Sequence, residues 1–90
     1  MQQDQAETIA IQALTFLAED EDRLARFLVM SGVGPSEMRE RIGDGVFLGG
    51  VLDFLLGHDP DVIDFAAWAD LPPEIIMTAR RALPGGDVIE

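Results

Sequence analysis

The chain has 90 residues, 48% of them apolar, which is enough for one domain with its own hydrophobic core. Its formal charge of −11, from seventeen acids against six arginines, repels nucleic acid and anionic membranes and favours a basic partner. The chain has no cysteine, which excludes disulfides and thiolate metal sites.

Nothing in the sequence predicts export or membrane insertion. The first ten residues, MQQDQAETIA, have no basic region ahead of an apolar run, so we expect no secretory signal. The most apolar stretch, Gly45–Leu56, is too short to span a bilayer and carries Asp53. We therefore expect a cytoplasmic protein, ordered over about residues 4–84 as a single helical domain with frayed tails.

Apolar periodicity predicts two helices in the first third of the chain. Asp4, with Glu7 three residues later, predicts a capping box for a first helix that runs to about Ala18. The acids of Glu19–Asp22 suit the positive end of a second helix. Gly32 is expected to end that helix in a left-handed conformation.

A short third helix is predicted next. Pro35 suits its first position, and the spacing directs Met38 and Ile42 inward before Gly43 stops the helix. Asp44 is then expected to cap the following helix.

The stretch GVFLGGVLDFLL, residues 45–56, predicts the central helix of the fold. A helix that is hydrophobic nearly all round is buried, so we expect other helices to surround it and Phe54 and Leu55 to lie in the core. Gly49 and Gly50 each cost about 1 kcal/mol relative to alanine in a helix. We expect a neighbouring backbone to approach both glycines closely.

Two further helices are predicted in the last third. Asp59-Pro60 predicts a helix with Asp59 as its cap, Leu71–Glu74 interrupts the chain, and a sixth helix stops before Pro84. Asp87–Glu90 is expected to form a short tail. The inner positions are expected to be Val62, Phe65, Ala66 and Ala69 in one helix and Ile75, Ile76, Ala79, Ala82 and Leu83 in the other. No segment alternates with period two, so the prediction is an all-α compact bundle of five to six short helices.

A faint repeat appears at an offset of 38 residues. Apolar positions in residues 9–17 correspond to those in residues 47–55, and positions in residues 24–31 correspond to those in residues 62–69. Two interpretations remain open. Either two similar three-helix halves arose by duplication, or two amphipathic halves share similar loop lengths.

The turn Ser31–Pro35 resembles the hairpin of helix-hairpin-helix DNA-binding motifs. The backbone N–H groups of Gly32, Val33 and Gly34 would face a phosphate in such a motif. No lysine follows the turn, whereas Glu37 does. Weak binding of a nucleic-acid backbone is therefore the alternative function, and the overall charge makes nucleic acid an unfavourable partner.

The chain lacks the residue groupings that catalysis and metal binding need. His58 is the only histidine, and no spacing pairs it with a serine or threonine nucleophile. The acids cluster without the calcium-loop pattern and suit helix starts: Asp59, Asp61 and Asp64 in one cluster, and Asp20 and Asp22 in another. We expect no enzymatic activity, no cofactor and no bound metal.

Met30 and Trp68 are equivalent under the offset and lie about 60° beyond the inner stripes of their helices. They either cover each other between the halves, or form an exposed patch with Val29 and Ala67 that marks a partner site. The leading functional hypothesis is a non-catalytic protein-interaction or regulatory module, a monomer or weak dimer. The sequence does not identify its protein partner, and the charge favours a basic one.

The phrases FLAED, SGVGP and VLDFLL resemble a small bacterial family, chiefly alphaproteobacterial, known only as a domain of unknown function. The resemblance covers roughly residues 6–84. It implies a stand-alone cytoplasmic helical protein of about this length, and it implies no activity, cofactor or catalytic residue.

Overall fold

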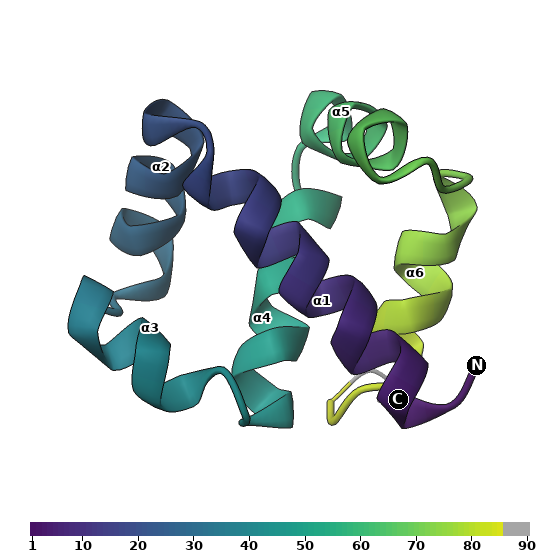
Figure 1. Cartoon of the computed structure of the whole chain (residues 1–90), viewed down its shortest axis with the longest axis horizontal. Coiled ribbons are helices and arrows are strands. Elements are labelled where there is room, and N and C mark those ends of the chain that lie inside the picture. Colours follow the sequence, from purple (N-terminus) through teal and green to yellow (C-terminus); the bar gives the residue numbers. More distant parts are fainter. Residues whose placement is uncertain (86–90) are drawn as a thin grey trace.

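The computed structural model describes residues 1–85, which form six α-helices and no strand (Figure 1). The predicted all-α class is therefore confirmed, while the expected tail Asp87–Glu90 lies outside the described residues. The helices are α1 (Gln3–Ala18), α2 (Glu21–Ser31), α3 (Pro35–Arg41), α4 (Gly45–Leu56), α5 (Asp59–Ala69) and α6 (Glu74–Arg81).

Helices α1 and α4 cross at the centre, with α2 and α3 on one side and α5 and α6 on the other (Figure 1). As predicted, α4 is largely buried, through Phe47, Leu48, Gly49, Val51, Leu52 and Leu55. Helix α1 contributes three fully buried alanines, whose small side chains allow close packing of neighbouring helices. Phe54 was expected in the core together with Leu55, but its ring is only half-buried.

Two helix starts differ from the prediction. Helix α1 begins one residue before Asp4, because the Gln5 side chain accepts a hydrogen bond from the Gln2 backbone N–H at 3.3 Å. Helix α5 begins after His58, whose carbonyl accepts the backbone N–H of Asp61 at 2.9 Å. Asp59, the expected cap, is thus the first residue of the helix.

Helix α3 is peripheral, and none of residues 35–41 is buried. Met38 is half-buried against the core as expected. The inward placement of Ile42 was wrong, since this side chain is 38% exposed. Ile42 lies just past the end of a seven-residue helix, where the chain already turns toward the Asp44 cap of α4.

The predicted left-handed cap of α2 is confirmed. Gly32 has φ +72°, and its N–H donates to the Leu28 carbonyl at 3.0 Å. Val33, the next residue, is buried. Asp70 ends α5 in the same left-handed conformation, with φ +57°. This second left-handed cap was not predicted, because aspartate adopts this conformation less readily than glycine.

The two halves correspond closely in structure. Helix α5 (residues 59–69) begins and ends 38 residues after the corresponding ends of α2 (residues 21–31). The residue that follows each of these helices has a left-handed backbone conformation. The ring of Phe16 lies 5.6 Å from that of Phe65, and the equivalent pair, Phe54 and Phe27, lies at 5.5 Å. Each half therefore packs one phenylalanine against the other half at a similar distance, although the ring planes meet at 57° in the first pair and at 79° in the second.

A buried carboxylate joins α2 to α5. The Asp61 side chain, 1% exposed, accepts hydrogen bonds from Arg23 Nε at 3.0 Å and Arg26 Nη2 at 3.1 Å. His58 Nδ1 lies 3.2 Å from its second oxygen. The sequence pattern predicts for Asp61 only a position at a helix start, and it does not predict these ion pairs.

The pKa of Asp61 reflects this environment. Burial would raise the pKa, but the hydrogen bond and charge of Arg26, with hydrogen bonds from Arg23 and His58, outweigh burial and lower it. A lowered folded-state pKa stabilises the fold above the ordinary value of 3.8. This contribution is lost as the pH falls through the lower, folded-state value.

Asp61→Asn is expected to reduce the free energy of unfolding at pH 7 by about 1–3 kcal/mol, because the arginines lose their carboxylate. The difference from wild type should shrink as the pH falls below 3.8, where the carboxyl of Asp61 becomes neutral in the unfolded chain, and should vanish below its lowered folded-state pKa. Urea unfolding at a series of pH values measures both effects. Asp59→Asn, at an exposed position of the same helix, is the control, and an equal loss there would contradict the role of Asp61.

Candidate functional site

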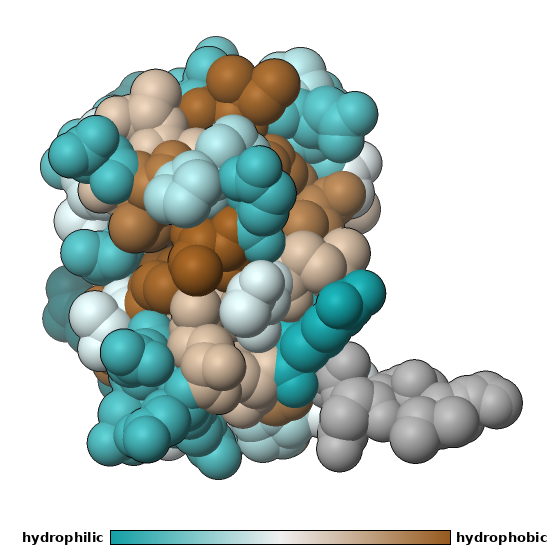
Figure 2. Space-filling model, turned by 90° about the vertical axis from the view of Figure 1, so that its right-hand side faces the viewer, coloured by the Kyte–Doolittle hydropathy of each residue, from teal (hydrophilic) through white to brown (hydrophobic). Residues whose placement is uncertain are grey.

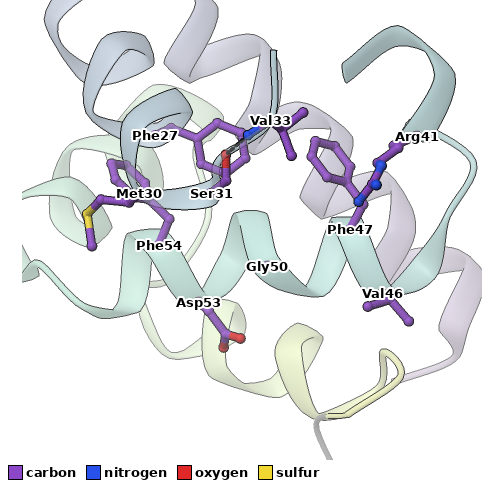
Figure 3. A pocket seen from close by; sticks show the side chains of 10 residues that line it. All are labelled: Phe27, Met30, Ser31, Val33, Arg41, Val46, Phe47, Gly50, Asp53 and Phe54. Atoms are coloured by element: carbon purple, nitrogen blue, oxygen red, sulfur yellow. Dashed lines mark hydrogen bonds between the residues drawn. The ribbon is translucent and has the colours of Figure 1, made fainter. Parts of the chain in front are cut away.

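An open groove lies between α2 and α4, and we call it the α2–α4 groove (Figure 3). Its volume is about 410 Å³. The side chains around it come from the second half of α2, the turn after it, the end of α3 and the outer face of α4: Phe27, Met30, Ser31, Val33, Arg41, Val46, Phe47, Gly50, Asp53 and Phe54.

Three phenylalanine rings form the floor of the α2–α4 groove. Phe27 lies edge-on to Phe47 at 5.9 Å and to Phe54 at 5.5 Å between ring centres. At the rim, Met30 is 76% exposed and Val46 is 67% exposed. Large apolar side chains that stay exposed around an apolar hollow are typical of interaction surfaces.

The polar residues of the groove are few. Figure 3 shows the Asp53 carboxylate directed away from the phenylalanine rings. This carboxylate accepts a hydrogen bond from Arg80 Nε at 2.6 Å, so α6 engages it. Arg41 and Ser31 are the other polar side chains of the lining. The lining is therefore predominantly apolar, with one cation at the α3 end.

A second, shallow hollow lies on the outer side of α2. Ala25, Arg26, Val29 and Met30 line it. Val29 is 82% exposed, and Met30 borders both hollows. The α2–α4 groove thus continues onto an exposed apolar strip of α2.

The predicted partner residues fall into two places. Met30 lines the α2–α4 groove and Val29 lines the shallow hollow beside it, whereas Trp68 lies against the rings of Phe16 and Phe65, at 5.6 and 6.1 Å. The Trp68 indole N–H donates to Glu19 at 3.2 Å, and the side chain is 43% exposed. Met30 and Trp68 do not cover each other, since Met30 is 76% exposed at the groove and Trp68 lies against Phe16 and Phe65. Ala67 is exposed beside Trp68 on α5.

The turn that resembled a phosphate-binding hairpin has its N–H groups engaged. Gly32 donates to the Leu28 carbonyl at 3.0 Å, and Val33 donates to the Ser31 hydroxyl at 3.3 Å. Gly34 donates to the Glu37 carboxylate at 3.2 Å. The carboxylate of Glu37 thus occupies a place that a bound anion would need, so the geometry favours a structural turn.

The two glycines of α4 have different surroundings. A Cβ on Gly49 would lie 2.8 Å from the Arg80 guanidinium and 3.3 Å from the Pro84 carbonyl oxygen, which confirms the expected close approach. Arg80 also donates to that carbonyl at 3.1 Å, so it is held in place. At Gly50 the expectation was wrong. No atom of residues 1–85 beyond its own helix lies within 4 Å of such a Cβ, because Gly50 faces the α2–α4 groove.

The described residues offer no evident centre for metal chemistry. Within residues 1–85, no group of three or more His, Cys, Asp or Glu side chains is arranged to hold a metal ion. Of the acidic cluster in α5, Asp61 and Asp64 are both ion-paired with Arg23. None of the helices in this part of the chain has the length and apolarity needed to cross a membrane.

Gly49→Ala and Gly50→Ala are expected to change stability in opposite directions. Gly50→Ala should raise the free energy of unfolding by about 0.5–1 kcal/mol, because alanine restricts the unfolded chain and meets no atom in the fold. Gly49→Ala should lower it, because the new methyl group displaces Arg80 from Asp53 and Pro84. Thermal and urea unfolding of both variants tests this, and equal effects would contradict the assignment.

Comparison with known proteins identifies the family of the chain but not its function. No curated protein and no solved structure matches the chain. One family model, described as "Protein of unknown function (DUF3572)", matches residues 3–86, which include all six helices. The expected resemblance to a family of unknown function is thereby confirmed, and the chain belongs to the DUF3572 family.

Proposed function

We propose that this protein is a non-catalytic protein-interaction module whose α2–α4 groove binds a segment of another protein. One observation carries the proposal. Three phenylalanine rings form the groove floor, and the neighbouring side chains of Val29, Met30 and Val46 are 82, 76 and 67% exposed. Covering this surface would release water from apolar area, which is the main driving force of protein association.

The shape of the groove favours a polypeptide segment over a small molecule. Sites for small molecules enclose most of their ligand and direct several polar groups at it. The α2–α4 groove is open and continues along α2 past Met30. Its polar side chains are few, and Asp53 already pairs with Arg80.

Apolar surface is also exposed on the face that carries α5 and α6, as Figure 2 shows. The large apolar side chains that these two helices expose are Ile63, Trp68 and Met77, at 59, 43 and 44%. These fractions are lower than those of Val29 and Met30, and Trp68 already lies against two phenylalanine rings. The groove is therefore the better candidate for a partner surface.

The sequence and the family resemblance support three further parts of the proposal. The module is cytoplasmic, its hosts are bacteria, chiefly alphaproteobacteria, and it catalyses no reaction. Binding of a nucleic-acid backbone at Ser31–Pro35 has less support, because the charge is −11 and the N–H groups of the turn already donate within the protein.

Site-specific cross-linking in the native host tests the proposal. The photoreactive residue benzoylphenylalanine replaces Met30 in one variant and Met77, on α6, in the control. Cross-links from position 30 should map to one segment of a defined protein, and position 77 should not capture that segment.

The captured partner is then purified and its affinity measured. Val29→Glu should weaken binding by about tenfold or more, whereas Met77→Glu should leave it unchanged. Equal capture from positions 30 and 77, or loss of binding in Met77→Glu alone, would place the partner surface elsewhere and overturn the proposal.

A further inference from the structure

Two charged positions of α2 and their equivalents in α5 carry opposite charges. Under the 38-residue offset, Arg23 corresponds to Asp61, and Arg26 corresponds to Asp64. These four side chains pair with one another across the contact between α2 and α5, which we call the α2–α5 contact. The two helices therefore present complementary charges at matching positions.

The ion pairs of the α2–α5 contact are reciprocal. Arg23 pairs with Asp64. The equivalent pair, Asp61 with Arg26, also forms, with 3.1 Å between Asp61 Oδ1 and Arg26 Nη2. Arg23 pairs in addition with its own equivalent, Asp61, at 3.0 Å. In an interface with twofold symmetry residue i contacts j while j contacts i, and the α2–α5 contact has this arrangement, with cations on one side and anions on the other.

The opposite charges make the α2–α5 contact selective. In the same arrangement, two copies of α2 would place Arg23 against Arg23, and two copies of α5 would place Asp61 against Asp61. Asp61 is 1% exposed, and a buried charge without a counter-ion is strongly destabilising. Specificity comes from repulsion in the wrong pair as well as from attraction in the right pair. The contact thus favours α2 with α5 over either helix with a copy of itself.

Much of the core also lies between the two halves of the chain, residues 1–41 and residues 45–85. Helix α1 of the first half packs against α4, α5 and α6 of the second. The ring of Phe16 in the first half lies 5.6 Å from that of Phe65 in the second. A repeat unit that cannot bury its hydrophobic face alone needs a neighbouring unit to cover it. Each half therefore depends on a partner half for its core.

A short turn, residues 42–44, connects the two halves. It follows α3, which has no buried residue among 35–41, and the Ile42 side chain is 38% exposed. Within residues 1–85, a Cβ on Gly43 would meet no atom within 4 Å beyond its chain neighbours. A change of chain direction at this turn would therefore expose little apolar surface. Exchange of an identical element between two copies of a chain is a low-cost route to a dimer.

We infer that the α2–α5 contact is a recognition interface that accepts a second copy of this chain. The first half of one copy pairs with the second half of the other, and the ion pairs and phenylalanine contacts of the monomer form again between the copies. Within one chain the turn holds the two halves at a high effective concentration, so the monomer dominates unless its own α2–α5 contact is blocked. This inference goes beyond the proposed function and does not depend on any ligand of the α2–α4 groove.

Three charge variants of the full chain test the exchange of halves. The acidic variant combines Arg23→Asp with Arg26→Asp, so four carboxylates meet at its own contact. The cationic variant combines Asp61→Arg with Asp64→Arg, so four guanidinium groups meet there. Neither chain can form the contact alone, whereas the two chains together can form it by exchange. The inverted variant carries all four substitutions and restores opposite charges within one chain.

The acidic and cationic variants should each lose the cooperative thermal transition that circular dichroism records for the wild type. Mixing them in equal amounts in urea, followed by dilution, should restore the transition. Native mass spectrometry should then detect a complex with one chain of each kind. The inverted variant should fold alone as a monomer, because a reciprocal contact tolerates inversion of its charges.

A matched control makes the same changes of charge outside the α2–α5 contact. One control chain combines Arg39→Asp with Arg81→Asp, and the other combines Asp22→Arg with Asp59→Arg. All four side chains are exposed. Each control chain should keep its thermal transition, and the mixture should remain monomeric.

Three outcomes would overturn the inference. If the mixture stays unfolded while the inverted variant folds, the halves do not exchange between copies. If the acidic variant alone melts like the wild type, the charges do not select the partner half. If the inverted variant does not fold, the contact is not reciprocal. The cross-linking result at position 30 is independent of all three, so a failure here and a failure of the proposed function are distinguishable.

Discussion

The burial of α4 is the constraint on which the rest of the structure depends. Helix α4 is apolar almost all round, so water must be removed from several of its faces at once. No single helix covers so much surface, and α1, α2, α5 and α6 all pack against it. The two termini of α4 are set by the Asp44 cap and by the turn at Gly57.

One face of α4 is not covered by these helices, and it forms one side of the α2–α4 groove. Helix α3 is tied to α4 by a short turn and has no buried residue, while Phe27 packs α2 against α4 and the ion pairs of Arg23 and Arg26 with Asp61 join α2 to α5. The groove therefore follows from how α2 is anchored at both α4 and α5.

The helices themselves could be predicted because their apolar spacing and their caps are local signals. Gly32 and Asp44 act as expected, whereas the first-turn acids Asp4 and Asp59 were wrongly chosen as caps. Asp61 and the groove could not be predicted, since the placement of α2 over α4 and α5 depends on long-range contacts. The angular positions of Met30 and Trp68 predicted only that both lie at the edge of an apolar stripe, and the fold was needed to show that Met30 is exposed while Trp68 lies against Phe16 and Phe65.

Native-state hydrogen exchange of the backbone amides most directly tests the claim that buried α4 organises the fold. If the claim holds, amides in the buried part of α4, such as Val51, Leu52 and Leu55, exchange only through global unfolding and are the slowest together with those of α1. Amides of α3, which has no buried residue among 35–41, exchange fastest among the helices. Exchange of α4 ahead of α2 and α5 would contradict the account.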